Sequence, residues 1–352
     1  MSSLNRREFL KTLLCAGLVG CTGDYGRGIS YSDRRHLKGE GKLTGEPSDL
    51  KPFKFAYVTD SHLSITGKNG AALKAESVKI FEDVLHQINS MKDLNFILFG
   101  GDNWDNTDKG TPDVDKFLDM VKDLKVPYLI QFGNREASPM PPGDPTDKKE
   151  FVRLFRGHGF REGTFWWDVE VMPGVVVLGL DTSIRGHNDG AMPEEEIQWL
   201  KERLEGNGGK FIIVLTHHLF LPTWTPKEIP RWDKNYLIAN SERVRPLIEG
   251  SRKVKLVLSG HHHVTKIDVI NKLPYISSPA TVQYPHAFRT FYVNGNTAKL
   301  QFHQIRSREI ISLGRELLIK EKAQEYGPGG FEDVAAYCMG RPEDQDTVLT
   351  VR

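Results

Sequence analysis

Short apolar runs alternate with longer amphipathic stretches along the chain from Phe53 onward. The runs are rich in β-branched and aromatic residues and are short, so we expect them to be strands. A hairpin with Asn294 and Gly295 at its tip is expected at 288–305, because Asn-Gly favours tight turns between paired strands. The other expected strands are 53–59, 95–99, 127–132, 164–171, 174–180, 211–216 and 255–259.

The stretches between these runs have the apolar spacing of helices. One helix begins at Thr111 and Pro112, which supply a good cap and a proline at the first position. The other expected helices are 71–92, 193–204, 241–249 and 310–324, the last of which leads into a polar tail. Strands that alternate with helices predict a layered α/β fold, and the sequence contains no internal repeat.

The composition is that of an ordinary globular protein, with 352 residues, 39% of them hydrophobic and 26% charged. This length allows one large domain or two small ones. The formal net charge is +1 and no long basic block is present, so we expect no nucleic-acid surface. Beyond the N-terminus, no apolar run reaches the roughly 18 residues of a membrane-spanning helix.

The first 21 residues have the features of an export signal. Arg6 and Arg7 precede a short, mostly apolar segment that ends at Cys21. The run Arg-Arg-Glu-Phe-Leu-Lys resembles a twin-arginine (Tat) signal, and Leu-Val-Gly-Cys resembles a lipobox. These resemblances imply a bacterial protein exported to the periplasm or cell envelope and anchored in the membrane through lipidated Cys21. The alternative is a disordered N-terminus with a chance arginine pair.

Residues 22–51 are rich in Gly, Ser and charged residues without periodicity, which is typical of a tether. Folding should begin near Pro52. Of the three cysteines, Cys15 and Cys21 lie in the leader region, so only Cys338 belongs to the body. A disulfide framework is therefore excluded for the body.

Five of the expected strands end in residues that can bind a metal ion. Carboxyl ends of parallel strands meet at one edge of a sheet, so these side chains can converge. Carboxylate, amide and imidazole ligands suit divalent Mn, Fe and Zn. Each residue alone is more commonly a turn or packing residue, but five together favour a site. The strand ends are Asp60-Ser61-His62, Gly101-Asp102, Gly133-Asn134-Arg135-Glu136, His217-His218 and His261-His262-His263.

The ordered set Asp-x-His, Gly-Asp, Gly-Asn-x-Glu, His and Gly-His-x-His resembles the calcineurin-like metallophosphoesterases, and in particular the bacterial cyclic-nucleotide and glycerophosphodiester phosphodiesterases. The resemblance covers roughly residues 53–305 and implies a metallophosphoesterase domain at 52–305, followed by a C-terminal helix and tail at 306–352. It implies an α/β fold in which two mixed sheets pack face to face between helices, a four-layer α/β/β/α sandwich. It also implies two divalent or mixed-valence metal ions, Mn, Fe or Zn.

Carried over to this chain, the resemblance assigns Asp60, His62 and His263 to one metal. It assigns Asn134, His217 and His261 to the other, with Asp102 as the bridge. The implied reaction is hydrolysis of a small-molecule phosphomonoester or phosphodiester by a metal-bound hydroxide. His218 is expected next to the metals, in a position to donate a hydrogen bond to the substrate.

Arg135 stands where most family members have a histidine that contacts the phosphoryl group. A guanidinium can clamp phosphate but cannot donate and retrieve a proton, so general acid catalysis must come from elsewhere. His218, His262, His187 and His286 are the candidates. The alternative is a catalytically impaired binding protein of the cell envelope.

Four further positions carry weaker expectations. Asp105 stands where purple acid phosphatases have a tyrosine ligand, which argues against that subtype. Trp104 is expected in packing or in the pocket wall, and Asp181 in structural hydrogen bonds. The segment 283–289 either borders the pocket or forms the turn into the hairpin.

Overall fold

The computed structural model describes residues 50–105, 112–137, 148–161, 163–206, 209–223, 235–323 and 330–351. The expected leader at 1–21, nearly all of the tether at 22–51, and Thr111 lie outside the described residues. Within the described part of the chain, no helix is both long and apolar enough to cross a membrane.

The strands form two mixed sheets of six strands each. The first has the order β12-β11-β10-β1-β2-β3, in which β1, β2 and β3 run parallel and the others antiparallel. Its strands are β1 (Phe53–Val58), β2 (Phe96–Gly100), β3 (Tyr128–Gln131), β10 (Ala287–Asn294), β11 (Thr297–Gln304) and β12 (Thr347–Thr350).

The second sheet has the order β4-β5-β6-β7-β9-β8. Its four central strands run parallel, and an antiparallel strand lies at each edge. Its strands are β4 (Trp167–Met172), β5 (Val175–Gly179), β6 (Phe211–Leu215), β7 (Val254–Ser259), β8 (Lys266–Ile270) and β9 (Leu273–Ser277).

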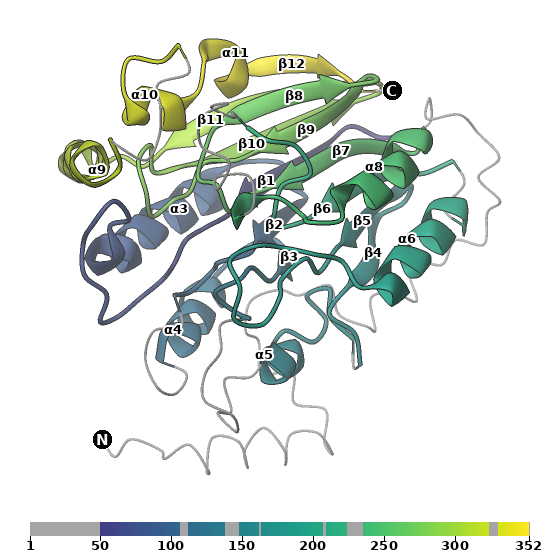
Figure 1. Ribbon diagram of the computed structural model, residues 1–352, viewed down its shortest axis with the longest axis horizontal. Helices are drawn as coiled ribbons and strands as arrows, with labels where there is room; N and C mark the ends of the chain where they lie inside the picture. Colours follow the sequence, from purple (N-terminus) through teal and green to yellow (C-terminus); the bar gives the residue numbers. More distant parts are fainter. Residues whose placement is uncertain are drawn as a thin grey trace.

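The two sheets pack face to face, and helices cover their outer faces. The rings of Phe53 in β1 and Phe211 in β6 meet edge-on with centroids 5.4 Å apart, which joins the sheets in one core. Helices α3 (Ser77–Ser90) and α4 (Pro112–Val121) lie on one side of the strands, and α6 (Glu194–Gly206) and α8 (Ser241–Gly250) on the other (Figure 1). This confirms the predicted four-layer sandwich.

The remaining helical elements lie outside the two main helical layers. They are η2 (Lys74–Glu76), α5 (Lys148–Leu154), α9 (Arg308–Lys322), α10 (Val334–Met339) and α11 (Pro342–Gln345). The sequence pattern predicted α9 but missed α5, α10 and α11, each of which is too short for clear helical periodicity. It also missed β8 and β9, since β8 is a half-buried edge strand without a continuous apolar run.

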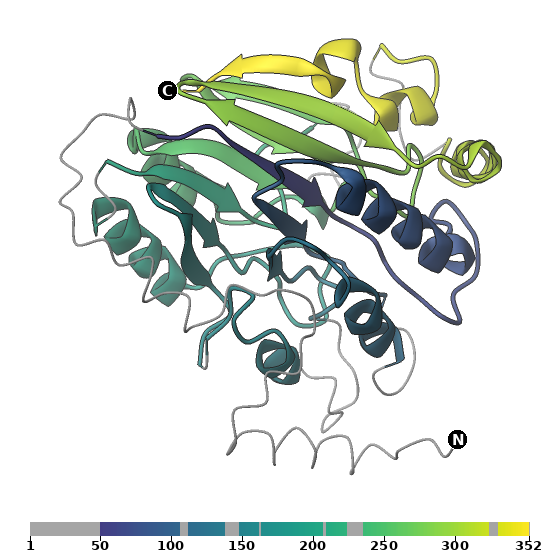
Figure 2. The ribbon, with the colours of Figure 1, turned by 180° about the vertical axis from the view of Figure 1, so that it is seen from behind.

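The segment after Arg306, expected to be a helix and a polar tail, packs on the first sheet. Strand β12 pairs with β11, and Figure 2 shows this last segment along the β10–β11 hairpin. The buried guanidinium of Arg289 donates hydrogen bonds to the carbonyl oxygens of Asp344 (2.6 Å) and Gln345 (3.1 Å). These bonds satisfy backbone groups that no helix or strand partner reaches, and they hold the segment in place.

Candidate metal centre

The seven residues expected to bind metal follow the carboxyl ends of five strands and meet in the structure. Asp60, His62, Asp102, His261 and His263 all have positive φ, between 38° and 64°. This left-handed conformation is uncommon for residues other than glycine and concentrates at functional sites. It turns each side chain off the strand end and toward the common edge.

The first cluster joins the β1 and β7 ends to Asp102. His263 Nε2 lies 3.2 Å from Asp60 Oδ1 and 3.3 Å from His62 Nε2. His62 Nε2 lies 3.5 Å from Asp102 Oδ2. Asp60, His62 and His263 form one of the groups close enough to share a metal ion.

The second cluster forms around His217 on the other side of Asp102. His217 Nε2 lies 3.4 Å from Asp102 Oδ1, 3.2 Å from Asn134 Oδ1 and 3.1 Å from His261 Nδ1. The two oxygens of Asp102 therefore face different clusters. The structure thus brings together the residues that the resemblance assigns to each metal, and Asp60, Asp102 and His217 are also close enough to share an ion.

Acceptors behind the first cluster fix how its imidazoles carry their protons. His62 Nδ1 lies 3.3 Å from Asp105 Oδ1, and His263 Nδ1 lies 3.2 Å from Gln283 Oε1. Both oxygens accept hydrogen bonds, so each Nδ1 carries the proton and each Nε2 keeps its lone pair. Two lone pairs that face each other at 3.3 Å repel unless a cation lies between them.

The second cluster has the same arrangement with backbone acceptors. His217 Nδ1 donates to the carbonyl oxygen of Gly100 at 3.0 Å, and His261 Nε2 to that of Asn235 at 2.8 Å. When both rings are neutral, as metal binding requires, His217 Nε2 and His261 Nδ1 present lone pairs to each other. Acceptors that orient imidazoles in this way are the usual second layer of a metal site. The residues thus fit two divalent cations.

The electrostatics favour positive charge at these points. Burial would raise the pKa of Asp102, but contacts to His217 and His62 hold that pKa well below its usual range. Burial lowers the pKa of His217, and the ionised Asp102 outweighs burial and raises it to about 9. The metal-free site therefore stabilises a proton beside Asp102, and a bound cation would take its place.

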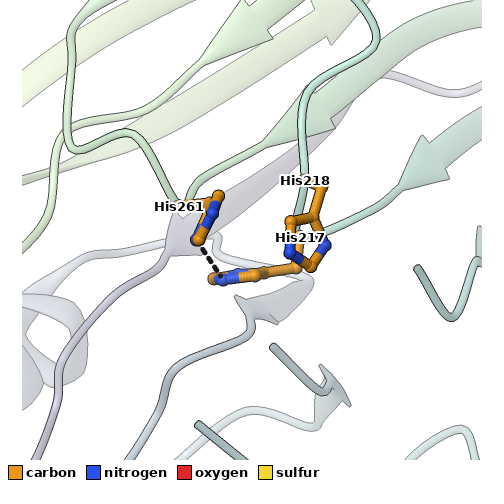
Figure 3. A group of neighbouring side chains, drawn as sticks. All are labelled: His217, His218 and His261. Carbon is orange, nitrogen blue, oxygen red and sulfur yellow. Dashed lines mark hydrogen bonds between the residues drawn. The ribbon is translucent and has the colours of Figure 1, made fainter. Parts of the chain in front are cut away.

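His218 differs from His217 in the hydrogen-bond partners of its two ring nitrogens. Nδ1 lies 2.8 Å from Thr182 Oγ1 and Nε2 lies 3.1 Å from the carbonyl oxygen of Asn188. His218 packs beside His261, with ring centroids 4.4 Å apart, but in Figure 3 the dashed contact joins only His217 and His261. The Nε2 atom of His218 therefore contacts a residue that lines the cleft, and His218 forms with His217 and His261 a group close enough to share a metal ion. Its expected contact with substrate stays a prediction.

His262, the middle histidine of the triple, points away from both clusters. Its Nδ1 lies 2.5 Å from Thr223 Oγ1, which in turn bonds the Tyr337 hydroxyl at 3.0 Å. The ring also stacks near Tyr236, with centroids 4.5 Å apart. His262 therefore links β7 to the C-terminal segment, and it also lines the cleft.

A cleft of about 750 Å³ opens onto Asp102 and the first cluster. Arg135 lines it, and so does Lys74, which the sequence did not single out. Lys74 Nζ lies 2.7 Å from Asp105 Oδ2, and Arg135 Nε lies 3.9 Å from Asp105 Oδ1. Burial raises the pKa of Asp105, but its bonds to His62 and Lys74 outweigh burial and lower it to about 2. Asp105 is thus an anion that orients the proposed metal ligand His62 and contacts the cationic side chains of Lys74 and Arg135.

The C-terminal segment, after Arg306, contributes residues to the site. The sequence pattern did not predict whether this segment reaches the site. Glu321 lines the cleft and its Oε2 accepts a hydrogen bond from the amide of Ala71 at 2.7 Å. Cys338 is buried, and its sulfur accepts a hydrogen bond from Gln283 Nε2 at 3.8 Å. Gln283 lines the cleft, so segment 283–289 borders the pocket at its first residue.

The other residues that the sequence singled out lie outside the cleft. Trp104 is fully buried among phenylalanine rings, as expected for packing. Asp181 accepts hydrogen bonds from Lys148 and Ser183, which is a structural role. His187 is exposed beside Asp189, and His286 is buried with Nδ1 on the carbonyl oxygen of Thr281. Neither histidine is among the residues that line the cleft.

Residues 53–265 match the family model described as calcineurin-like phosphoesterase. A protein of Arcobacter nitrofigilis named "probable glycerophosphodiester phosphodiesterase GpdQ" is 28% identical over 221 residues, which cover 61% of this chain and 74% of the relative. The Haemophilus influenzae 3',5'-cyclic adenosine monophosphate phosphodiesterase CpdA is 24% identical over 233 residues, or 65% of this chain and 76% of the relative.

Among solved structures, a dimetal phosphatase from Danio rerio has the same fold, with a TM-score of 0.58 at 15% identity. The match covers 72% of this chain and 97% of the zebrafish chain. The family model spans more than half of the chain and includes the strand ends described above. The chain therefore belongs to the calcineurin-like phosphoesterase family of metal-dependent phosphoric ester hydrolases.

Proposed function

We propose that the chain is a dinuclear metal-dependent phosphoesterase that hydrolyses phosphomonoesters or phosphodiesters. The observation that carries the proposal is the position of Asp102, whose Oδ1 lies 3.4 Å from His217 Nε2 and whose Oδ2 lies 3.5 Å from His62 Nε2. One carboxylate can therefore bridge two cations. The proposed ligands are Asp60, His62 and His263 for the first cation, Asn134, His217 and His261 for the second, and Asp102 for both.

When bound, two divalent cations neutralise phosphate oxygens and lower the pKa of the water that attacks phosphorus. The donor set suits Mn, Fe or Zn. Asp60 and Asp102 bring the only carboxylates among the proposed ligands, so the cations keep most of their charge for the substrate. Arg135 adds positive charge on the cleft wall but is too weak an acid to protonate a leaving group.

The size of the cleft supports a small-molecule phosphate ester as the substrate, because its volume of about 750 Å³ lies in the range of ligand pockets. The names of the relatives from Arcobacter nitrofigilis and Haemophilus influenzae refer to phosphodiesters. The cleft volume favours a small molecule over a macromolecule, and the relatives' names support a phosphodiesterase activity of the same metal site.

The test uses residues 22–352 loaded separately with Mn, Fe or Zn, with p-nitrophenyl phosphate and bis-p-nitrophenyl phosphate as substrates. We expect metal-dependent turnover that is lost in Asp102→Asn and kept in Asp123→Asn, a matched change at an exposed position. The preferred ester decides between monoesterase and diesterase. A metal-loaded protein that stays inert until Arg135→His restores turnover would support the binding role instead.

The same proposal assigns the protein to the cell envelope, anchored through lipidated Cys21. The support is the twin-arginine and lipobox pattern of the first 21 residues. The test is fractionation of bacteria grown with labelled palmitate. Label and protein should both appear in the membrane fraction and both leave it in Cys21→Ser, and replacement of Arg6 and Arg7 by lysine should block export. A soluble, unlabelled wild-type protein would overturn this part.

A further inference from the structure

Two cations stand on the cleft wall beside the proposed metal pair. Lys74 and Arg135 both line the cleft, together with Asp102 and His62. The Lys74 side chain is 24% exposed and that of Arg135 is 38% exposed, so both reach the solvent of the cleft. Neither position belongs to the proposed ligand set.

One buried carboxylate holds both cations. Asp105, whose side chain is fully buried, has Lys74 Nζ 2.7 Å from Oδ2 and Arg135 Nε 3.9 Å from Oδ1. Oδ1 also lies 3.3 Å from His62 Nδ1, so Lys74 is one carboxylate and one imidazole away from the first cluster. Asp105 offers one negative charge to both cations, and the cleft lining adds Lys68 and Lys322 as further positive charges and Glu321 as a further negative charge. Preorganised positive charge stabilises an anion without further rearrangement.

The chemistry of the leaving group indicates which class of substrate these two cations would favour. An alkyl phosphodiester expels an alkoxide, a strong base that needs a proton as it departs. Arg135 cannot supply one, because a guanidinium stays protonated in proteins. A phosphate group leaves without protonation at neutral pH, because its second pKa is about 6. It carries negative charge away, and fixed cations stabilise that charge.

We propose that the preferred substrates are diphosphate esters, whose phosphoanhydride bond is cleaved while Lys74 and Arg135 hold the departing phosphate. This inference rests on the dinuclear site proposed above and extends its substrates from phosphate esters to a phosphoanhydride. Water adds to one phosphorus atom, and the bond from that atom to the bridging oxygen breaks. The bridging oxygen and the bonding pair leave with the second phosphate, and the proton from water passes to solvent. The products are two phosphate monoesters.

The test compares two matched substrates on the full-length, Mn-loaded protein. Diadenosine diphosphate contains the anhydride, and adenylyl adenosine joins the same nucleosides through a phosphodiester. We expect kcat/KM to favour the diphosphate, and Lys74→Met to lower that preference at least about tenfold. Lys74→Arg should retain most of it. The control is Lys79→Met, since Lys79 is exposed, pairs with Glu76 and lies outside the cleft lining.

A binding measurement on the metal-free protein separates charge recognition from metal loss. Calorimetry with the methylene-bridged, non-hydrolysable analogue of diadenosine diphosphate should show at least about tenfold weaker binding in Lys74→Met. Lys79→Met should bind like wild type. Because no metal is present, this measurement reports the charge effect of Lys74 even if Lys74→Met also weakens metal binding through Asp105 and His62.

Two outcomes would overturn the inference. One is equal turnover of both dinucleotides by wild type, and the other is an unchanged preference and unchanged analogue binding in Lys74→Met. Either result leaves the proposed function standing as long as bis-p-nitrophenyl phosphate is hydrolysed with metal. Failure to hydrolyse any of the three esters would instead contradict the proposed function itself.

Discussion

The carboxylate of Glu136 holds the backbone of Asp102 in place. Glu136 Oε2 accepts hydrogen bonds from the amides of Asp102 (3.0 Å) and Gly133 (2.7 Å), and Oε1 accepts one from Asn103 (2.7 Å). The fully buried Glu136 thus ties the loop after β2 to the loop after β3. These loops carry Asp102 and Asn134, so the spacing of the two clusters depends on this carboxylate.

Glu136→Gln should weaken both the fold and metal binding. Glutamine would turn one NH₂ group toward backbone N–H donors, which leaves buried donors unpaired at a cost of about 1–3 kcal/mol. Urea unfolding and a metal titration measure the two effects. Glu82→Gln, an exposed change on α3, serves as the control. Unchanged metal affinity in Glu136→Gln would show that the loops hold their positions without this carboxylate.

Gly260→Ala should disable the first cluster. A Cβ atom at Gly260 would lie against Asp60 Oδ2 and Thr59 Oγ1, closer than real contacts allow. Asp60 would be pushed from its place, and we expect affinity for one of two metal ions to fall at least about tenfold. Gly206→Ala is the matched control, since open space surrounds that position. Two unchanged binding events in Gly260→Ala would contradict the geometry.

Gln283→Leu should weaken metal binding at the first cluster by removing the hydrogen-bond partner of His263. Its Oε1 accepts from His263 Nδ1, and without it the ring loses the partner that directs Nε2 inward. Loss of such a partner typically lowers metal affinity about 10–100-fold. Cobalt substitution would show the altered site in its absorption spectrum. Cys338→Ala removes the weak bond to Gln283 and some packing in the cluster around Tyr337, but leaves the bond from His263 to Gln283, so it should affect the metal site less. The reverse order of the two variants would assign the orienting role to Cys338.

His158 should make stability depend on pH below neutrality. Its ring stacks on Tyr128 with centroids 4.0 Å apart, and Nδ1 donates to the Tyr128 carbonyl oxygen at 3.2 Å. Burial lowers the pKa of His158 from 6.5 to about 4, although this hydrogen bond partly offsets burial. Between these values the unfolded chain binds a proton that the folded chain does not. Stability from this residue is therefore complete above pH 6.5 and is lost as pH falls toward 4.

The loss is on the order of 3 kcal/mol over that range. Urea unfolding of the metal-free protein at several pH values measures it. His158→Asn keeps a donor near Tyr128 and removes the titration, so its stability should vary less with pH than that of wild type. Parallel curves for the two proteins would mean that His158 does not control acid stability.

Neighbouring residues alone predicted most of the strands, the polar residues that follow five of them, and the order of the proposed ligands. Burial and backbone geometry leave a periodic pattern over a few positions, so Asp60, Asp102 and His217 could each be recognised after an apolar run. The same pattern predicted the two-sheet sandwich through its resemblance to a family. It failed for β8 and the short C-terminal elements, whose half-buried or brief runs carry little periodicity.

Only the tertiary structure determined which residues contact each proposed ligand on the side away from the metal. Lys74 meets Asp105 across 31 positions, and Gln283 meets Cys338 across 55. The tertiary structure also places Thr182 and Asn188 against the two nitrogens of His218, and it places Glu321 in the cleft lining. Such contacts depend on how distant segments pack, and packing of this kind leaves no mark in the spacing of adjacent residues. The sequence therefore identified the proposed ligands, and the fold determined their orientation and the charge around them.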